Sequence, residues 1–397
     1  MSTPLDNAGH ADDIVPATAA YEAPLPTRKD FLAWHLPRKQ FVRHHQWCMQ
    51  LNLMLDESPL VDGTLKYFGL PGVDLLDLRY FHRQVCEVRN INLRFLGFNT
   101  AAQPSSPGQT ELNISLDEVR RMPRVDRNSD VLGDDFVRIA NDRSIAWRKA
   151  LDLGPYDVIN LDLCDGFGAQ APNTLEETHY DAVNKLMSLQ ARSSSPWLLL
   201  LTTRAGRQHV HPHVLEKLIG QYLDNLATCP PFKEKSRVFF EIEDEAALKA
   251  AAATTTGVLP VFLCGLCKWL VGIALEYQPP TSMEARSVIG YRVDYGAEHE
   301  DLISLAVRFT PTFEPAEDPI GLAKSSTTAL NECALAVQAL NRIANRKDVD
   351  RILREDAKLN TQMVDAMADL LELARYDTAA YRDWLATDAV SRKDSHG

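Results

Sequence analysis

The chain has 397 residues, a formal net charge of −12 and a hydrophobic fraction of 45%. This length exceeds the usual single-domain range, so we expect one large domain with appended segments. The net charge argues against a protein coated in phosphate-binding basic groups, and the apolar content is that of an ordinary globular core.

Seven cysteines are scattered along the sequence, most of them inside apolar runs. An odd number of scattered cysteines favours reduced, buried thiols, so we expect a cytoplasmic protein. The most apolar long segment runs from Val258 to Leu275, but Pro260 and Lys268 interrupt it. We therefore expect a buried helix there and no membrane partner.

Composition divides the chain into four expected regions. Residues 1–27 have too little apolar content to offset the entropy of ordering and should form a disordered tail. Residues 28–60 carry a helical pattern broken at Pro37. Residues 61–315 show alternating strand and helix patterns. Residues 316–397 form a helical region, whose apolar stripes should cover its own sheet or another chain through self-association or a protein partner.

Strand and helix patterns alternate through the central region. Five short apolar runs predict strands at Thr64–Gly69, Leu93–Phe98, Ser129–Phe136, Tyr156–Leu163 and Trp197–Thr202. Helical spacing falls at Asp74–Val88, Phe136–Leu151, Leu175–Ala191 and Val214–Leu226, and a capping box at Ser115 predicts the start of another helix. Such alternation predicts right-handed crossovers and a parallel sheet.

An antiparallel hairpin is expected at the end of this alternation, from Val288–Tyr295 and Leu302–Phe309. The pattern resembles the class I, Rossmann-like S-adenosylmethionine-dependent methyltransferases, whose seventh strand is inserted antiparallel beside the sixth. The resemblance covers Thr64 to Phe309 and rests on element order. It implies an α/β fold with a doubly wound, mainly parallel sheet and a terminal antiparallel hairpin, and S-adenosylmethionine as cofactor.

Ligands of doubly wound sheets bind outside the carboxyl ends of the strands. The resemblance places Gly69 and Gly72 under the methionine part of the cofactor, and Asn99 at the ribose hydroxyls, where the family has an acidic residue. It places Asp134 opposite the adenine amino group. Each position also has a plain structural interpretation, as a tight turn, a strand-end cap or a helix N-cap.

The fourth predicted strand ends in two carboxylates, Asp162 and Asp165. An unpaired charge in so apolar a strand is costly, so Asp162 must be hydrogen-bonded by a loop, a ligand or a metal. We take this pair as the candidate catalytic residues at the methyl acceptor. Phe167 is the candidate for stacking on a planar substrate, although the two prolines of the family's amino-methylating motif are missing.

Basic and aromatic residues interleave between residues 28 and 50, with Arg38 and Lys39 as candidate substrate-binding groups. Such a stretch can guide a nucleic acid toward the ligand edge of the sheet, or bind an acidic partner. A helix that packs its aromatics on the sheet and leaves its basic face in water explains the same residues.

Two further motifs have both a structural and a chemical interpretation. His209, His211 and His213 alternate as zinc or copper ligands do, but a polar loop explains them better without a second ligand cluster. Cys264 and Cys267 form a lone C-x-x-C inside the apolar segment, where we expect two buried thiols rather than a zinc or redox site. We therefore assign no metal.

Two functions remain open from the sequence. The first is a transferase that moves a methyl group from S-adenosylmethionine to an unidentified acceptor. The second is a catalytically inactive pseudoenzyme, in which the methyltransferase sheet is a scaffold or binding subunit of a larger, nucleic-acid-associated complex. A nucleotide hydrolase is excluded because the phosphate-binding loop sequence of that class is missing.

Overall fold

A computed structural model describes residues 30–163, 166–171, 177–293, 299–313 and 330–394. Its centre is an eight-stranded sheet in the order β3-β2-β1-β4-β5-β7-β6-β8. The strands are β1 (Thr64–Gly69), β2 (Asn92–Phe98), β3 (Asp130–Leu132), β4 (Val158–Asp162), β5 (Trp197–Arg204), β6 (Thr281–Tyr291), β7 (Leu302–Pro311) and β8 (Lys347–Asp348). The expected tail at residues 1–27 lies outside the described residues.

The strand order confirms the predicted fold class. Strands β1 to β5 pair in parallel, and β7 is inserted antiparallel between β5 and β6. This is the hairpin arrangement that the sequence predicted, so the chain has a Rossmann-like methyltransferase fold. Strand β6 begins at Thr281, earlier than predicted, because its first half alternates polar and apolar residues and carries a bulge between Ala285 and Ser287.

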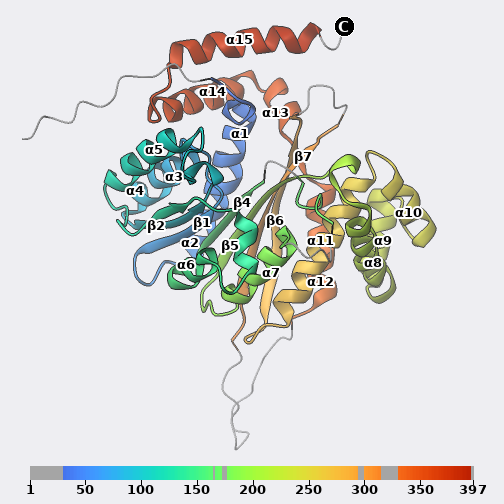
Figure 1. The fold of residues 1–397 in the computed structure, drawn as a ribbon. Coiled ribbons are helices and arrows are strands. Elements are labelled where there is room, and N and C mark those ends of the chain that lie inside the picture. The colour runs from blue at the N-terminus through green and yellow to red at the C-terminus, as the bar shows by residue number, and fades with distance from the viewer. Residues whose placement is uncertain (1–29, 164–165, 172–176, 294–298, 314–329, 395–397) are drawn as a thin grey trace, which may run out of the picture.

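Helices cover both faces of the sheet (Figure 1). The first face carries α1 (Pro37–Val42), the π-helical turn η2 (Arg43–Cys48), α2 (Met49–Glu57), α3 (Leu76–Phe81), η3 (His82–Cys86), α4 (Glu87–Arg89) and α5 (Gln109–Arg121). The second face carries α6 (Ile145–Leu153), α7 (His179–Gln190), α8 (Pro212–Thr228), α11 (Val258–Leu275) and α12 (Glu332–Ala344). Helices α13 (Val349–Glu355), α14 (Ala357–Glu372) and α15 (Thr378–Asp394) follow, with α14 and α15 above the carboxyl ends of the parallel strands.

Strand residues divide their side chains between two hydrophobic cores. Tyr67, Val158 and Leu198 point to the first face, and their neighbours Phe68 and Ile159 point to the second. Because both faces are covered, the central strands need apolar residues at consecutive positions. This double burial explains the nearly continuous apolar runs that marked the strands in the sequence.

Helix α11 confirms the expected buried helix at Val258–Leu275. It is long and apolar enough to cross a membrane, yet 78% of it is buried inside the fold. Lys268 interrupts its apolar surface, and its Nζ lies 2.8 Å from Asp224 Oδ2 of α8 and bonds Glu332 of α12. The helix therefore serves as a core element that α8 and α12 flank.

Three local predictions are wrong. Ser115 does not begin a helix, because α5 starts at Gln109 and buries Ser115 mid-helix. Two helices between α8 and α11 were not predicted: α9 (Pro230–Phe240) and α10 (Glu245–Ala253). Not all thiols are free, because Cys229 and Cys333 form a disulfide, whereas the four free cysteines of the described residues are buried as expected.

The C-terminal region uses its apolar stripes within the chain. Leu340 and Ile343 of α12 join the second core, and Met367 and Leu371 of α14 join the first. The short strand β8 extends the sheet beyond β6. The expectation that this region covers its own sheet is thereby confirmed for α12 and α14.

Two glycines of α11 offer a matched test of helix packing. A Cβ on Gly265 would lie 2.6 Å from the backbone oxygen of Leu218 in α8, whereas a Cβ on Gly272 would meet no atom within 4 Å. We expect Gly265→Ala to lower the free energy of unfolding by about 1–3 kcal/mol, because α8 must move. Gly272→Ala should raise it by up to about 1 kcal/mol through helix propensity. Urea unfolding measures both, and equal effects would contradict the close helix contact.

Asp157 precedes β4 and gives a pH-dependent test. Burial raises the pKa of this carboxyl to about 6, although it accepts a hydrogen bond from the Lys66 backbone N–H at 2.7 Å. Because its pKa is raised, the carboxyl favours the folded state fully when the pH is below its ordinary pKa of 3.8. This stabilisation is lost as the pH rises through about 6, where the buried group must ionise. Asp157→Asn should therefore gain about 1–3 kcal/mol relative to wild type between about pH 4 and pH 7.5. Urea unfolding at both pH values measures the gain, and a constant difference between the two proteins would refute the assignment.

Candidate functional site at the carboxyl edge of the sheet

Asp162, the last residue of β4, lies at the carboxyl edge and is paired with a lysine. The Nζ of Lys39 in α1 lies 2.7 Å from Asp162 Oδ1. The Lys39 side chain is only 4% exposed, and its ammonium also lies 4.5 Å from the centre of the Trp47 ring. The predicted need for a partner of Asp162 is met, and the partner belongs to the chain itself.

Helix α1 directs two further cations inward beside this pair. Arg43, directly after α1, donates from Nε to Asp77 Oδ1 at 2.7 Å, and Arg38 lies 3.4 Å from Asp350. Arg38 and Arg43 are both buried. The expectation of a solvated basic face is therefore wrong at these positions, because their charges are bound to carboxylates of α3 and α13, and nucleic-acid binding by this stretch stays a prediction.

A buried polar cluster continues beneath Asp162 on the same face. Asn160 is two residues earlier in β4 and pairs in register with Gly69 of β1. Within the described residues the Asn160 amide makes no hydrogen bond of good geometry, although it lies near enough to the Tyr67 hydroxyl to act on the pKa of that group. The Tyr67 ring lies over Gly69, with Oη 2.6 Å from where a Cβ would be, and burial raises the pKa of its hydroxyl. The space that Gly69 leaves is thus filled by the protein.

The loop after β1 is covered by the C-terminal region. Tyr376 Oη donates to Asp74 Oδ2 at 2.7 Å, and Arg79 donates to the Asp74 backbone oxygen at 3.0 Å and to the Leu373 oxygen at 2.8 Å. Gly72 differs from Gly69, because the place of its Cβ is open. Of the two predicted glycines, only Gly72 leaves room beside its backbone for a ligand.

The two remaining cofactor candidates lie at the ends of β2 and β3. The Asn99 amide donates to the Pro71 oxygen at 2.8 Å and accepts from the Ala101 N–H at 2.8 Å, so both of its ends are engaged by backbone. Asp134 accepts the Asp135 N–H at 2.9 Å, while Asp135 itself caps the next turn. Asn99 thus has the structural capping role, and Asp134 stays half-buried.

Phe167 does not face the carboxyl edge. It is 1% exposed, and its ring contacts His179, Tyr180 and Trp269 at centroid distances of 4.7–6.3 Å. The prediction that this ring stacks on a substrate is corrected, because core aromatics surround it. Asp165 lies outside the described residues, so its pairing with Asp162 stays a prediction.

The histidine and cysteine motifs have structural roles. His211 caps α8 through a bond from the His213 N–H at 3.2 Å. Cys264 and Cys267 are buried, and burial raises the pKa of Cys267 to about 12. Across the described ranges, no group of three His, Cys, Asp or Glu side chains is placed to hold a metal.

A pocket of about 410 Å³ lies between η2, η3 and α14, beside the edge but away from the predicted cofactor positions. His44, His45, Tyr80 and Arg83 are among its lining residues. Burial lowers the pKa of both imidazoles, and His44 Nδ1 lies 2.8 Å from Tyr80 Oη. Both imidazoles are therefore mainly uncharged at neutral pH, whereas Arg83 and Asp369 bring charged groups to the same lining.

Sequence comparison assigns the chain to a family. The PP_RS20740-like family profile matches residues 28–386. The chain belongs to the PP_RS20740-like family. The match spans the sheet, α1 and most of the C-terminal helices, so the elements that form the carboxyl edge all fall inside the matched residues. No curated protein matches the sequence.

Two of the solved structures that match come from bacteria and are very distant in sequence. A Listeria monocytogenes protein described as a class I S-adenosylmethionine-dependent methyltransferase shares 9% identity at a TM-score of 0.33, covering 80% of this chain and 73% of that one. A Vibrio vulnificus protein described as a modification subunit of a type I restriction enzyme shares 13% identity at a TM-score of 0.29, covering 78% of this chain and 55% of that one. These scores are too low to carry an argument, so the fold assignment rests on strand order.

The Lys39–Asp162 pair can be tested by removing one charge at a time. Lys39→Met keeps the side-chain stem but leaves Asp162 unpaired, so we expect a loss of about 3 kcal/mol in the free energy of unfolding. Adding Asp162→Asn should recover most of this loss. The control Lys249→Met removes an exposed pair with Glu245 and should leave stability unchanged. A failure of Asp162→Asn to recover stability in urea unfolding would show that Lys39 acts through packing.

Proposed function

We propose that this chain is a methyltransferase-fold protein that acts as a noncatalytic binding subunit. The observation that carries the proposal is the occupation of the carboxyl edge by the protein's own groups. Lys39 neutralises Asp162, Tyr376 bonds Asp74, and backbone atoms engage both ends of Asn99. Of the expected cofactor positions, Gly69 is covered by the Tyr67 ring and Asn99 is engaged by backbone atoms, so two of the four have no free group to offer S-adenosylmethionine in this arrangement.

The proposed partner is another protein. The net charge of −12 disfavours nucleic acid, and the inward cations of α1 would have to leave their carboxylates before they met a phosphate. A nucleic acid, if present in the complex, would then be held by another subunit. The proposed compartment is the cytoplasm.

A second function is favoured by two observations at the same edge. Gly72 leaves open space beside the loop after β1, and among the described residues the buried Asn160 amide makes no hydrogen bond of good geometry, with the Tyr67 hydroxyl as its polar neighbour. Buried amides usually find a protein or water partner, so an unsatisfied one invites a ligand. On this alternative the chain is a methyltransferase closed by α1 and the C-terminal region. S-adenosylmethionine would then supply the methyl group, and Asp162 would orient the acceptor once Lys39 leaves.

Calorimetric titration with S-adenosylmethionine and S-adenosylhomocysteine distinguishes the two functions. It should be run on wild type and on the double variant Lys39→Met with Tyr376→Phe, which weakens both closures. We expect no binding by either protein at millimolar ligand. Circular dichroism must show that the double variant is folded, because an unfolded protein also fails to bind.

Binding by the wild type would overturn the noncatalytic proposal, and binding by the double variant alone would support the closed methyltransferase. In either case Gly72→Val serves as the locating control, because it fills the open space beside the loop after β1. Loss of binding on Gly72→Val, with binding retained on Asp162→Asn, would place the cofactor at that loop and leave Asp162 for the acceptor.

A further inference from the structure

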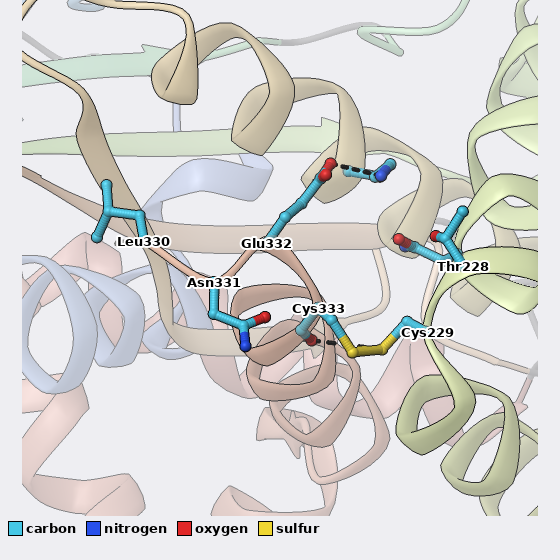
Figure 2. Close-up of a pocket in the computed structure, with 8 residues that line it drawn as sticks. Thr228, Cys229, Leu330, Asn331, Glu332 and Cys333 are labelled. Atoms are coloured by element: carbon cyan, nitrogen blue, oxygen red, sulfur yellow. Dashed lines mark hydrogen bonds and ion pairs between the residues drawn. A yellow bond between two sulfur atoms is a disulfide. The ribbon is translucent and has the colours of Figure 1, made fainter. Parts of the chain in front are cut away.

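The disulfide joins two helical segments that are far apart in sequence. Cys229 lies between α8 and α9, and Cys333 lies in the first turn of α12, 104 residues later, with a Cα–Cα distance of 5.4 Å. The bond ties the start of α12 to the junction of α8 and α9, as Figure 2 shows. It is therefore a covalent link across the second face of the sheet, and no part of the carboxyl edge contributes to it.

Both cysteines line a pocket of about 430 Å³ (Figure 2). Thr228, Asn331 and Lys268 line the same pocket and give it polar walls. Cys229 is 1% exposed, whereas Cys333 is only half-buried. An incoming molecule that enters this pocket therefore reaches the disulfide from the side of Cys333.

The four free cysteines of the described residues contrast with this pair. Cys48, Cys86, Cys264 and Cys267 are all buried, and burial raises the pKa of each thiol, to about 12 for Cys86 and Cys267. A thiol reacts as its thiolate, so these four protonated and buried cysteines are unreactive at neutral pH. Redox chemistry at the described cysteines thus concentrates on the pair beside the pocket.

We propose that Cys229–Cys333 is a reversible thiol–disulfide exchange site for a small thiol of the glutathione class. The thiolate of the small molecule attacks Cys333 Sγ, the bond between the two cysteines breaks, and Cys229 leaves as a thiolate that takes up a proton. A second thiolate attacks the small-molecule sulfur of the mixed disulfide, which releases the oxidised small-molecule disulfide and leaves Cys333 reduced. In the cytoplasm, bonded pairs are usually transient or redox-sensing, which suits an exchange site better than a permanent crosslink.

Exchange at this site acts on the start of α12. Once the bond is broken, the first turn of α12 keeps the bond of the Glu332 carboxylate to Lys268 of α11, which also contacts Asp224 of α8, and its own Asn331 cap, which accepts the Ala334 N–H at 3.0 Å. These contacts are weaker than a covalent bond. Reduction should therefore increase hydrogen exchange in the first turn of α12 and at the α8–α9 junction, while the central strands stay protected.

Trapping with oxidised glutathione tests the proposed asymmetry on the full chain. In Cys229→Ser, we expect a glutathione adduct on Cys333, because no partner thiol remains to resolve it. In Cys333→Ser, the buried Cys229 should form at least about tenfold less adduct under the same conditions. Peptide mass spectrometry locates the adducts, and thermal unfolding shows that both variants are folded.

Two results would overturn the proposal. One is the absence of a Cys229–Cys333 peptide in wild-type protein oxidised with oxidised glutathione, provided that mapping covers both cysteines. The other is equal adduct formation on the two single variants, which would show that the pocket does not direct attack to Cys333. The internal control is Cys264 and Cys267, which should remain unlabelled in every sample.

Discussion

The ion pair between Lys39 and Asp162 organises the carboxyl edge of the sheet. A carboxylate at the end of an apolar central strand is costly unless a charge or hydrogen bonds compensate it. Lys39 supplies that charge at 2.7 Å and is itself almost fully buried. Because each charge depends on the other, α1 must lie across the edge wherever the sheet is formed, and this position decides what else can reach the strand ends.

The pairs of Arg43 with Asp77 and Arg38 with Asp350 extend the same constraint to α3 and α13. Apolar contacts alone permit a helix to slide, whereas each ion pair is satisfied at one position. We interpret the three pairs as a device that sets the register of α1 against the sheet, α3 and the C-terminal helices. The C-terminal region then closes the loop after β1 through Tyr376.

The local hydrophobic pattern of the sequence was enough to predict the sheet. The contacts at the candidate site depend instead on ion pairs between residues far apart in the sequence. The runs at β1, β2, β4 and β5 were predictable because strands buried on both faces need consecutive apolar residues. The orientation of α1 was not, because Lys39 meets a carboxylate 123 positions away and no local signal records such a partner. The position of Asn160 could have been predicted, because side chains alternate along a strand and residues 160 and 162 therefore share one face of the sheet. Tyr376, by contrast, offered no signal, because it lies between α14 and α15 and its partner Asp74 is 302 positions away.

The means of closure bears on function. A ligand that binds at Asp162 would have to replace the Lys39–Asp162 pair, and removing one partner of a buried pair costs about 3–5 kcal/mol. A ligand that binds at Asp74 would have to displace Tyr376. A small ligand that binds with micromolar affinity gains about 8 kcal/mol in total, so the first cost alone would consume a large share of its binding free energy. A protein partner that docks on the outer helices would avoid the cost entirely, because their exposed faces take no part in the closure. The pairs at Asp162 and Asp74 therefore support the proposed binding role, and the open space beside Gly72 is where that role and the alternative make opposite predictions.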